Sequence, residues 1–289
     1  QSLDLNFRYR DDRFRVVAEI HGEYDLAYTL DDDKYDGPTM DTYQWRILHG
    51  EQFGAVSLGD FEIVLGRQIV AWGEGDVFSP LDVVNPRDLR EPGLADLDDL
   101  RLAVLASRWS YFASVGRFEV MVLHEAYFGE RPSPRAEYSP FVSILDRDPQ
   151  ASLILKDLTL DFAQVQDRYD PENWTALARF LHQGQGFDWG LYGGWLRDRQ
   201  GTLLMPDLGG LGVGALNLPL DHRRYWLGGH SGSLPLRSWL LKWELVAEIN
   251  KSFNTVKISG VIPDIGIEKT TLITGMAGLT WSGLENTTI

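Results

Sequence analysis

The chain has 289 residues, of which 44% are hydrophobic, and this is enough for a folded core and excludes global disorder. A formal net charge of −15 argues against nucleic acid as a partner, because phosphate binding needs a basic face. The lack of cysteine excludes disulfides, thiolate metal sites and cysteine nucleophiles. No run of about 18 apolar residues is present, so a transmembrane helix is excluded, whereas membrane-spanning strands remain possible because they hide their hydrophobicity by alternation.

The N-terminal residues alternate between apolar and polar side chains, with the period of a β-strand. Successive strand side chains point to opposite faces, so residues 3–10 and 13–28 each acquire one apolar and one polar face. Asp11 and Asp12 supply a turn between them, and the pattern predicts a hairpin over residues 3–28. If the strand lies in a membrane barrel, the face with Phe14, Val16, Ile20 and Tyr24 is expected to contact lipid. The opposite face is expected to line the lumen, with Arg13, Arg15, Glu19, His21, Glu23 and Asp25.

An acidic run at residues 31–33, followed by Gly37 and Pro38, predicts a longer polar loop. An EF-hand is excluded there, because Thr42 stands where the calcium loop requires glutamate; a looser calcium site stays open. A third strand is predicted over residues 42–57. Gly59 and Asp60 then turn the chain into a fourth strand at residues 61–66.

Residues 66–100 interrupt this pattern. Glycine and proline are too frequent here for a continuous strand or helix, yet Trp72, Phe78, Leu81 and Val84 are too apolar for a loop in solvent. A long loop with its own apolar side chains normally folds against the rest of the protein. We therefore predict that residues 72–100 fold inward, as a constriction or plug.

Alternating segments return after this interruption. They cover residues 117–128, 174–180 with 187–191 as a hairpin, 239–248, 256–260 and 272–281. The glycine-rich residues 209–217 lack the Lys-Ser/Thr of a phosphate loop and predict a crowded strand. With roughly ten to twelve strands of ~9–11 residues, we predict an all-β fold, an antiparallel transmembrane β-barrel of the outer-membrane type, as one domain over residues 1–289. The alternative is a soluble, aromatic-rich β-sandwich.

The sequence also resembles a known family. "GRQIVAWGEGD" and "LDVVNPRDLREPG" within residues 66–93, with "AEIHGEYDLAY" and "YQWRIL" before them, are similar to the Gram-negative outer-membrane family catalogued as domain of unknown function thirteen-oh-two. This resemblance implies a large barrel similar to alginate-export porins, in the bacterial outer membrane. It also implies transport of hydrophobic or lipid-like cargo beside inner-membrane exporters of the RND superfamily. Chains of this family are longer and this one ends within a strand pattern, so we expect further strands that are not part of these 289 residues.

The interrupted segment and its flanks contain the candidate functional residues. Their charges are expected either to select cargo at a constriction or to form ion pairs that hold the segment on the wall. These candidates are Arg67, Trp72, Glu74, Asp76, Asp82, Arg87, Asp88, Arg90, Asp96 and Arg101.

No pattern of catalytic or metal-binding residues stands out. The six histidines have no ligand spacing, and no serine lies in a nucleophile-elbow context, so we predict no enzyme activity, no metal and no cofactor. Three functions stay open: an outer-membrane channel or export conduit, a structural barrel subunit of an envelope assembly, and a soluble β-rich binding protein. The first two imply outer-membrane lipid as a partner, and the first also implies periplasmic or inner-membrane transport components.

Overall fold

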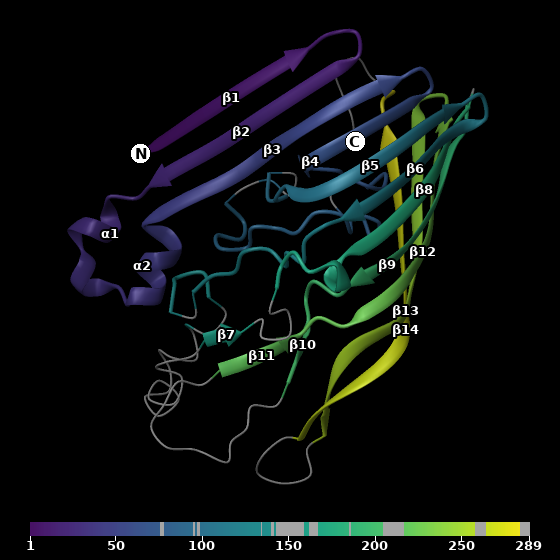
Figure 1. The fold of residues 1–289 in the computed structure, drawn as a ribbon. Coiled ribbons are helices and arrows are strands. Elements are labelled where there is room, and N and C mark those ends of the chain that lie inside the picture. Colours follow the sequence, from purple (N-terminus) through teal and green to yellow (C-terminus); the bar gives the residue numbers. More distant parts are fainter. Residues whose placement is uncertain are drawn as a thin grey trace.

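The computed structural model describes residues 1–75, 78–94, 96, 99–133, 135–139, 142, 159–161, 167–184, 186–204, 217–257 and 264–283. The described part is dominated by one antiparallel sheet of eleven strands, in the order β1-β2-β3-β4-β5-β6-β8-β9-β12-β13-β14 (Figure 1). The all-β prediction is thus confirmed. The strands of this sheet are β1 (Ser2–Arg10), β2 (Phe14–Tyr24), β3 (Trp45–Leu58), β4 (Phe61–Gln68), β5 (Val104–Ala113), β6 (Gly116–Leu123), β8 (Thr175–Gln183), β9 (Asp188–Arg197), β12 (Arg224–Leu236), β13 (Trp239–Lys257) and β14 (Asp264–Trp281).

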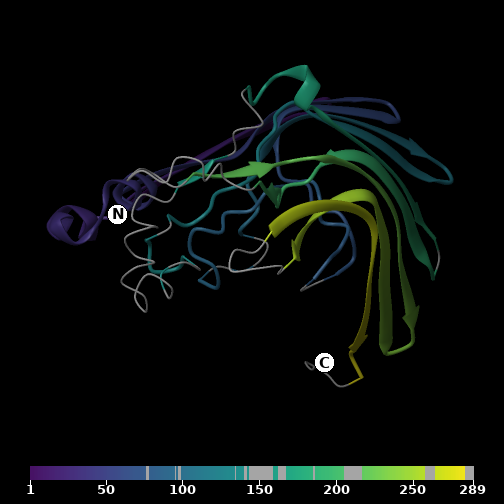
Figure 2. The same cartoon turned by 90° about the horizontal axis from the view of Figure 1, so that it is seen from below.

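The sheet curls but does not close. Figure 2 shows it bent around a hollow, with β1 and β14 as its two edges. Within the described residues, β1 pairs only with β2 and β14 only with β13, so no ladder joins the two edges. A second, small sheet contains β10 (Thr202–Leu203), β11 (Asn217–Asp221) and β7 (Thr159–Asp161). The glycine-rich residues 209–216 lie outside the described residues.

The N-terminal hairpin forms in the predicted register. Leu5 lies opposite Ile20 and Tyr9 opposite Val16, so the apolar side chains of β1 and β2 share one face. The strand predicted to reach residue 28 ends at Tyr24, because the chain turns there into the short helix α1 (Ala27–Leu30).

The predicted polar loop is also wrong in part. The 3-10 helix η1 (Asp32–Lys34) and the helix α2 (Gly37–Tyr43) replace it, and β3 begins at Trp45. The cause is local, because the Asp36 side chain accepts the amide of Thr39 at 3.0 Å and Pro38 stands in the first turn, both helix-start features. A second short 3-10 helix, η2 (Pro171–Asn173), precedes β8. No helix in the described ranges is long and apolar enough to cross a membrane.

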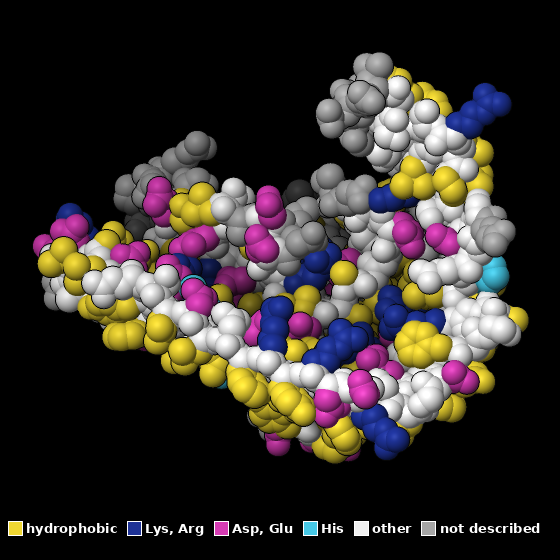
Figure 3. Space-filling model, turned by 90° about the horizontal axis from the view of Figure 1, so that it is seen from above, with side chains coloured by type: hydrophobic (Ala, Val, Ile, Leu, Met, Phe, Trp, Pro, Cys, Tyr) yellow, Lys and Arg dark blue, Asp and Glu magenta, His cyan; other side chains and the backbone are white. Residues whose placement is uncertain are grey.

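The two faces of the sheet differ in chemistry. The convex face exposes large apolar side chains on nearly every strand, and Figure 3 shows hydrophobic side chains along the outside and charged ones gathered in the hollow. Exposed apolar residues of this face include Leu5, Phe7, Phe14, Ile20, Trp45, Ile47, Phe61, Leu65, Trp109, Phe118, Val120, Leu191, Trp195, Trp226, Leu245 and Ile273.

The two ends of the sheet differ in the length of their connections. At one end, β1–β2, β3–β4, β5–β6, β8–β9 and β12–β13 are joined by turns as short as Gly59–Asp60 and Arg237–Ser238. At the other end, residues 25–44, 69–103, 124–174 and 198–223 form long connections. Of these, residues 69–103 will be called the inner segment, because their described part packs against the concave face.

Candidate functional site

The candidate site is the concave face together with the inner segment. The segment contributes Val70, Trp72, Leu81 and Val84 to the main hydrophobic core. Their partners are inward-facing side chains of β6, β8, β9, β12 and β13, and the rings of Trp72 and Tyr192 lie 5.4 Å apart. The wall residues of this core include Met121, Leu177, Tyr192, Leu227 and Val246.

A buried carboxylate on the wall binds the start of the segment. Glu244, on β13, accepts the backbone amides of Glu74 at 2.5 Å and Gly75 at 2.8 Å through Oε1. Its Oε2 accepts the Ser79 hydroxyl at 2.8 Å and the Leu81 amide at 3.2 Å. One side chain therefore satisfies four donors of a turn that contains little regular structure.

The turn leaves no space for a side chain at Gly73. A Cβ at this position would lie 2.1 Å from Ser79 Oγ and 2.6 Å from Glu244 Oε1, and its φ of +97° also favours glycine. The glycines that made residues 66–100 unlike a strand thus allow the backbone to approach the wall carboxylate.

Ion pairs hold the middle of the segment together. Asp82 is buried, and one of its oxygens lies 2.9 Å from Arg87 Nη2 and 3.0 Å from Arg101 Nε. Asn85 joins the two ends of the segment to each other and to β4, since it accepts the amide of Val70 and donates to the carbonyls of Gln68 and Leu102.

A second set of ion pairs lies where the segment approaches α2 and β3. Asp88 and Arg90 form a pair with two hydrogen bonds, at 2.9 and 2.5 Å. Burial alone would raise the pKa of Asp88, but the hydrogen bonds and charge of Arg90 outweigh it and hold the pKa below its ordinary value. The Tyr43 hydroxyl donates to the Arg90 carbonyl at 2.9 Å, and burial raises the pKa of Tyr43 to about 12.

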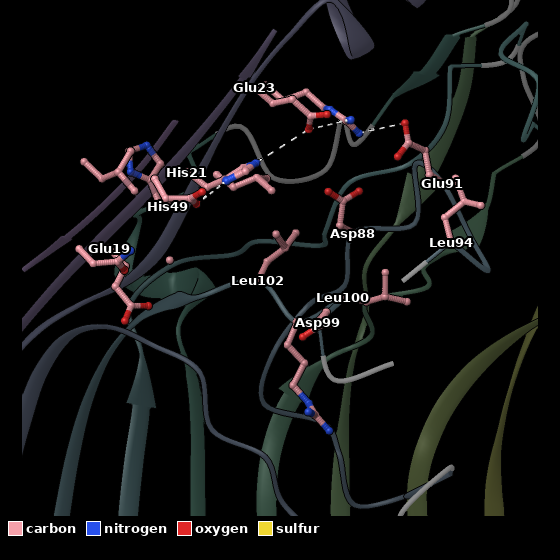
Figure 4. Close-up of a pocket in the computed structure, with 17 residues that line it drawn as sticks. Glu19, His21, Glu23, His49, Asp88, Glu91, Leu94, Asp99, Leu100 and Leu102 are labelled. Carbon is pink, nitrogen blue, oxygen red and sulfur yellow. Dashed lines mark hydrogen bonds and ion pairs between the residues drawn. The ribbon is translucent and has the colours of Figure 1, made fainter. Parts of the chain in front are cut away.

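Arg46 bridges the wall and the segment. Its guanidinium lies 2.8 Å from Glu23 on β2 and 3.0 Å from Glu91 on the segment. This bridge borders a cavity of about 460 Å³ between β1–β3 and residues 88–102 (Figure 4). His21 also faces this cavity, with Nδ1 2.7 Å from Asp4 Oδ1.

The charged residues predicted for the polar face of β2 lie in several different surroundings. Glu19, His21 and Glu23 line the cavity of Figure 4, and Glu19 also pairs with Arg8 at 2.5 Å. Arg15 pairs with Glu62 of β4 at 3.3 Å. Arg13 lies in the exposed β1–β2 turn. Asp25 accepts the amide of Ala27 at the start of α1, and so lies beyond the end of the strand.

The candidates in and beside the segment are likewise dispersed. Arg67 donates to both oxygens of the buried Glu125 at 3.0 Å, and this carboxylate also binds Arg168. Trp72 packs against the wall. The ion pairs Asp82–Arg87, Asp82–Arg101 and Asp88–Arg90 lie within the segment. Glu74 contributes its backbone amide to Glu244, Asp96 is exposed, and Asp76 lies outside the described residues.

Several site residues were missed by the sequence analysis. Glu244 is the buried acceptor for the backbone of the inner segment. Glu125 with Arg168, and Glu119 with Arg179, belong to buried ion-pair clusters. Glu244 did stand at a polar position of an alternating strand, but its partner lies 170 residues away in the sequence, and spacing cannot reveal such a pair. Among the described residues, no three histidine, aspartate or glutamate side chains gather so that they could hold a metal ion.

Comparison with known proteins finds a family match for part of the chain, to a family without a known function. No curated protein matches the chain. Residues 2–116, which contain the N-terminal hairpin, the inner segment and β5, match the family described as protein of unknown function (DUF1302). The resemblance to this family expected from the sequence is therefore confirmed over these residues.

Proposed function

We propose that the curved sheet is part of the wall of an outer-membrane β-barrel, and that the protein is a channel or export conduit of the bacterial outer membrane. The observation that carries this proposal is the convex face, where aliphatic side chains lie between two rows of aromatic ones. Near the short turns, the ring centres of Phe61 and Tyr111 lie 4.6 Å apart, and those of Phe118 and Phe180 lie 4.5 Å apart. Near the long connections, the ring centres of Tyr24 and Trp45 lie 4.5 Å apart, and those of Trp195 and Trp226 lie 6.1 Å apart.

The separation of the two rows fits a membrane. Phe14 and Tyr24 are ten residues apart on β2, which at about 3.3 Å per residue is roughly 33 Å along the strand. A strand tilt of about 40° reduces this to roughly 25 Å along the membrane normal, the height of the apolar band in outer-membrane barrels. A soluble protein would expose this whole band to water, and contiguous apolar patches of that size are rare in soluble monomers.

The connections support the same proposal. Outer-membrane barrels have short turns on the periplasmic side and longer loops outside. By this rule the turns at Gly59–Asp60 and Arg237–Ser238 face the periplasm, and the inner segment enters the hollow from the outer side. An open sheet edge is costly in lipid, so the barrel needs strands beyond the eleven described to separate β1 and β14 from it.

The inner segment then narrows the path along the concave face. Its buried core and the four hydrogen bonds to Glu244 also favour a second function, a plugged structural barrel. The two functions differ in whether ions pass. Similarity to alginate-export barrels, and a partnership with an RND-type exporter carrying hydrophobic cargo, stay predictions from the family resemblance.

The test combines fractionation with conductance. The full chain should partition with outer membranes and, in planar bilayers, deletion of residues 74–98 should raise single-channel conductance. Glu244→Ala, which frees the segment without removing it, serves as a second variant, and Asp31→Asn with Asp33→Asn is the control at the same end. Recovery in the aqueous fraction would overturn the barrel, and zero conductance in all variants would leave the structural barrel as the function.

A further inference from the structure

Four arginines form a group on the concave face, toward the end of the sheet with the short turns. They are Arg15 on β2, Arg108 on β5, Arg117 on β6 and Arg179 on β8, and they will be called the arginine group. The strand register places their side chains on the same face of the sheet. Arg108 on β5 lies opposite Val64 on β4 and Met121 on β6, and Arg179 on β8 lies opposite Glu119 on β6. Figure 3 shows Lys and Arg side chains gathered in this hollow.

The carboxylates beside the group do not neutralise it. Glu119 is fully buried, lies 2.8 Å from Arg179 Nε, forms an ion pair with Arg117, and accepts the Ser110 hydroxyl at 3.3 Å. Glu62 lies 3.3 Å from Arg15. Four arginines and two glutamates leave a local charge of 4 − 2 = +2, within a chain whose net charge is −15.

Arg108 holds the excess charge. Within the described part of the chain no carboxylate lies within ion-pair distance of its guanidinium, and its buried Nε has no hydrogen-bond partner. A partly buried charge without a partner is costly, so its retention beside two further guanidiniums indicates that a partner comes from outside the chain.

We propose that the arginine group binds an anionic group of the molecule that the protein holds or conducts: a carboxylate, phosphate or sulfate. This inference deepens the proposed function by naming the charge class of the cargo, and its conduction arm rests on that function. Guanidinium groups present several donors in a fixed plane, and this matches the oxygens of such anions. Arg108 and Arg117 are half-buried, whereas Arg179 is paired with Glu119 and lies 5.2 Å from the ring of Trp72. The inner segment therefore borders the group on one side.

The test measures binding and conduction separately. Titration calorimetry of the full chain in detergent with inorganic phosphate, sulfate and succinate should show binding that Arg108→Gln weakens about tenfold or more. Arg108 forms no ion pair in the described chain, so its removal leaves no carboxylate unpaired, unlike Arg117 or Arg179. Arg237→Gln, in the exposed β12–β13 turn, is the charge-matched control and should bind as the unaltered protein does.

A potassium chloride gradient across a planar bilayer supplies the second readout. The unaltered channel should prefer chloride, and Arg108→Gln should shift the reversal potential toward potassium, whereas Arg108→Lys should retain the preference. Equal binding of all three anions to Arg108→Gln and to Arg237→Gln would overturn the inference. Anion binding that depends on Arg108 but no conductance would support the anion site while contradicting the channel. If Arg108→Gln does not fold, Arg108→Lys must weaken binding of these anions, and unchanged affinity would overturn the inference.

Discussion

The contribution of the four hydrogen bonds to the Glu244 carboxylate can be tested with a nearly isosteric substitution. In Glu244→Gln, a single carbonyl oxygen can serve Glu74 and Gly75, but the new amide group then faces the Leu81 N–H, a second donor. Hydrogen bonds to a charged group contribute about 1.5–3 kcal/mol each and those between neutral groups about 0.5–1.5 kcal/mol. We expect the substitution to destabilise the docked segment by roughly 2–3 kcal/mol, and Glu244→Ala by about 3–5 kcal/mol.

Amide hydrogen exchange measures this loss of stability of the docked segment directly. Amides that exchange through local opening speed up about tenfold for each 1.4 kcal/mol, so Glu244→Gln should accelerate exchange in peptides covering residues 72–84 by roughly 30-fold or more. Glu268→Gln, on an exposed position of β14, is the matched control and should leave these peptides unchanged. If Glu244→Gln protects residues 72–84 as well as the unaltered protein does, the carboxylate does not hold the segment.

Two further predictions concern the membrane face and pH. Ile20 is exposed between the aromatic rows, so Ile20→Arg should lower the free energy of unfolding in lipid vesicles by about 2–4 kcal/mol. An unfolding curve equal to that of the unaltered protein would contradict a lipid-facing position on β2. Burial lowers the pKa of His222, between β11 and β12, to about 4, while the unfolded chain takes up its proton near pH 6.5. The stability that this residue contributes is therefore complete above pH 6.5 and decreases as the pH falls toward 4, by up to about 1.4 kcal/mol per pH unit. His222→Gln should flatten this part of the stability profile, and an unchanged profile would contradict the assignment to His222.

The strands were predictable because their signal is local. Alternation over residues 3–28 fixes which side chains share a face, and the β1–β2 register pairs Leu5 with Ile20 as expected. The hairpin of β8 and β9 was also correct, since its turn is rich in glycine. The helix α2 was missed because a capping aspartate and a proline also occur in loops, and only the hydrogen bond from Thr39 to Asp36 distinguishes the two. The helix α1 was missed because it has only four residues and no side-chain cap.

The candidate site was predictable only in its composition. Charged residues crowd the segment, but spacing did not reveal that Arg46 joins Glu23 to Glu91, or that Arg67 binds Glu125. These partners lie on different strands, and their proximity depends on the curvature of the sheet. The unneutralised arginine group was missed for the same reason, because its members lie on β2, β5, β6 and β8.

The attachment of the inner segment to β13 has a consequence for the order of folding. Most neighbouring strands of the sheet follow one another in the chain, so their hairpins can form early and locally. The bonds from Glu74 and Gly75 to Glu244 close loops of 170 and 169 residues, and they can form only after β13 has joined the wall. Until then the segment stays undocked and exposes Trp72 and Leu81, so its docking cannot precede the addition of β13, the tenth of the eleven strands of the described sheet.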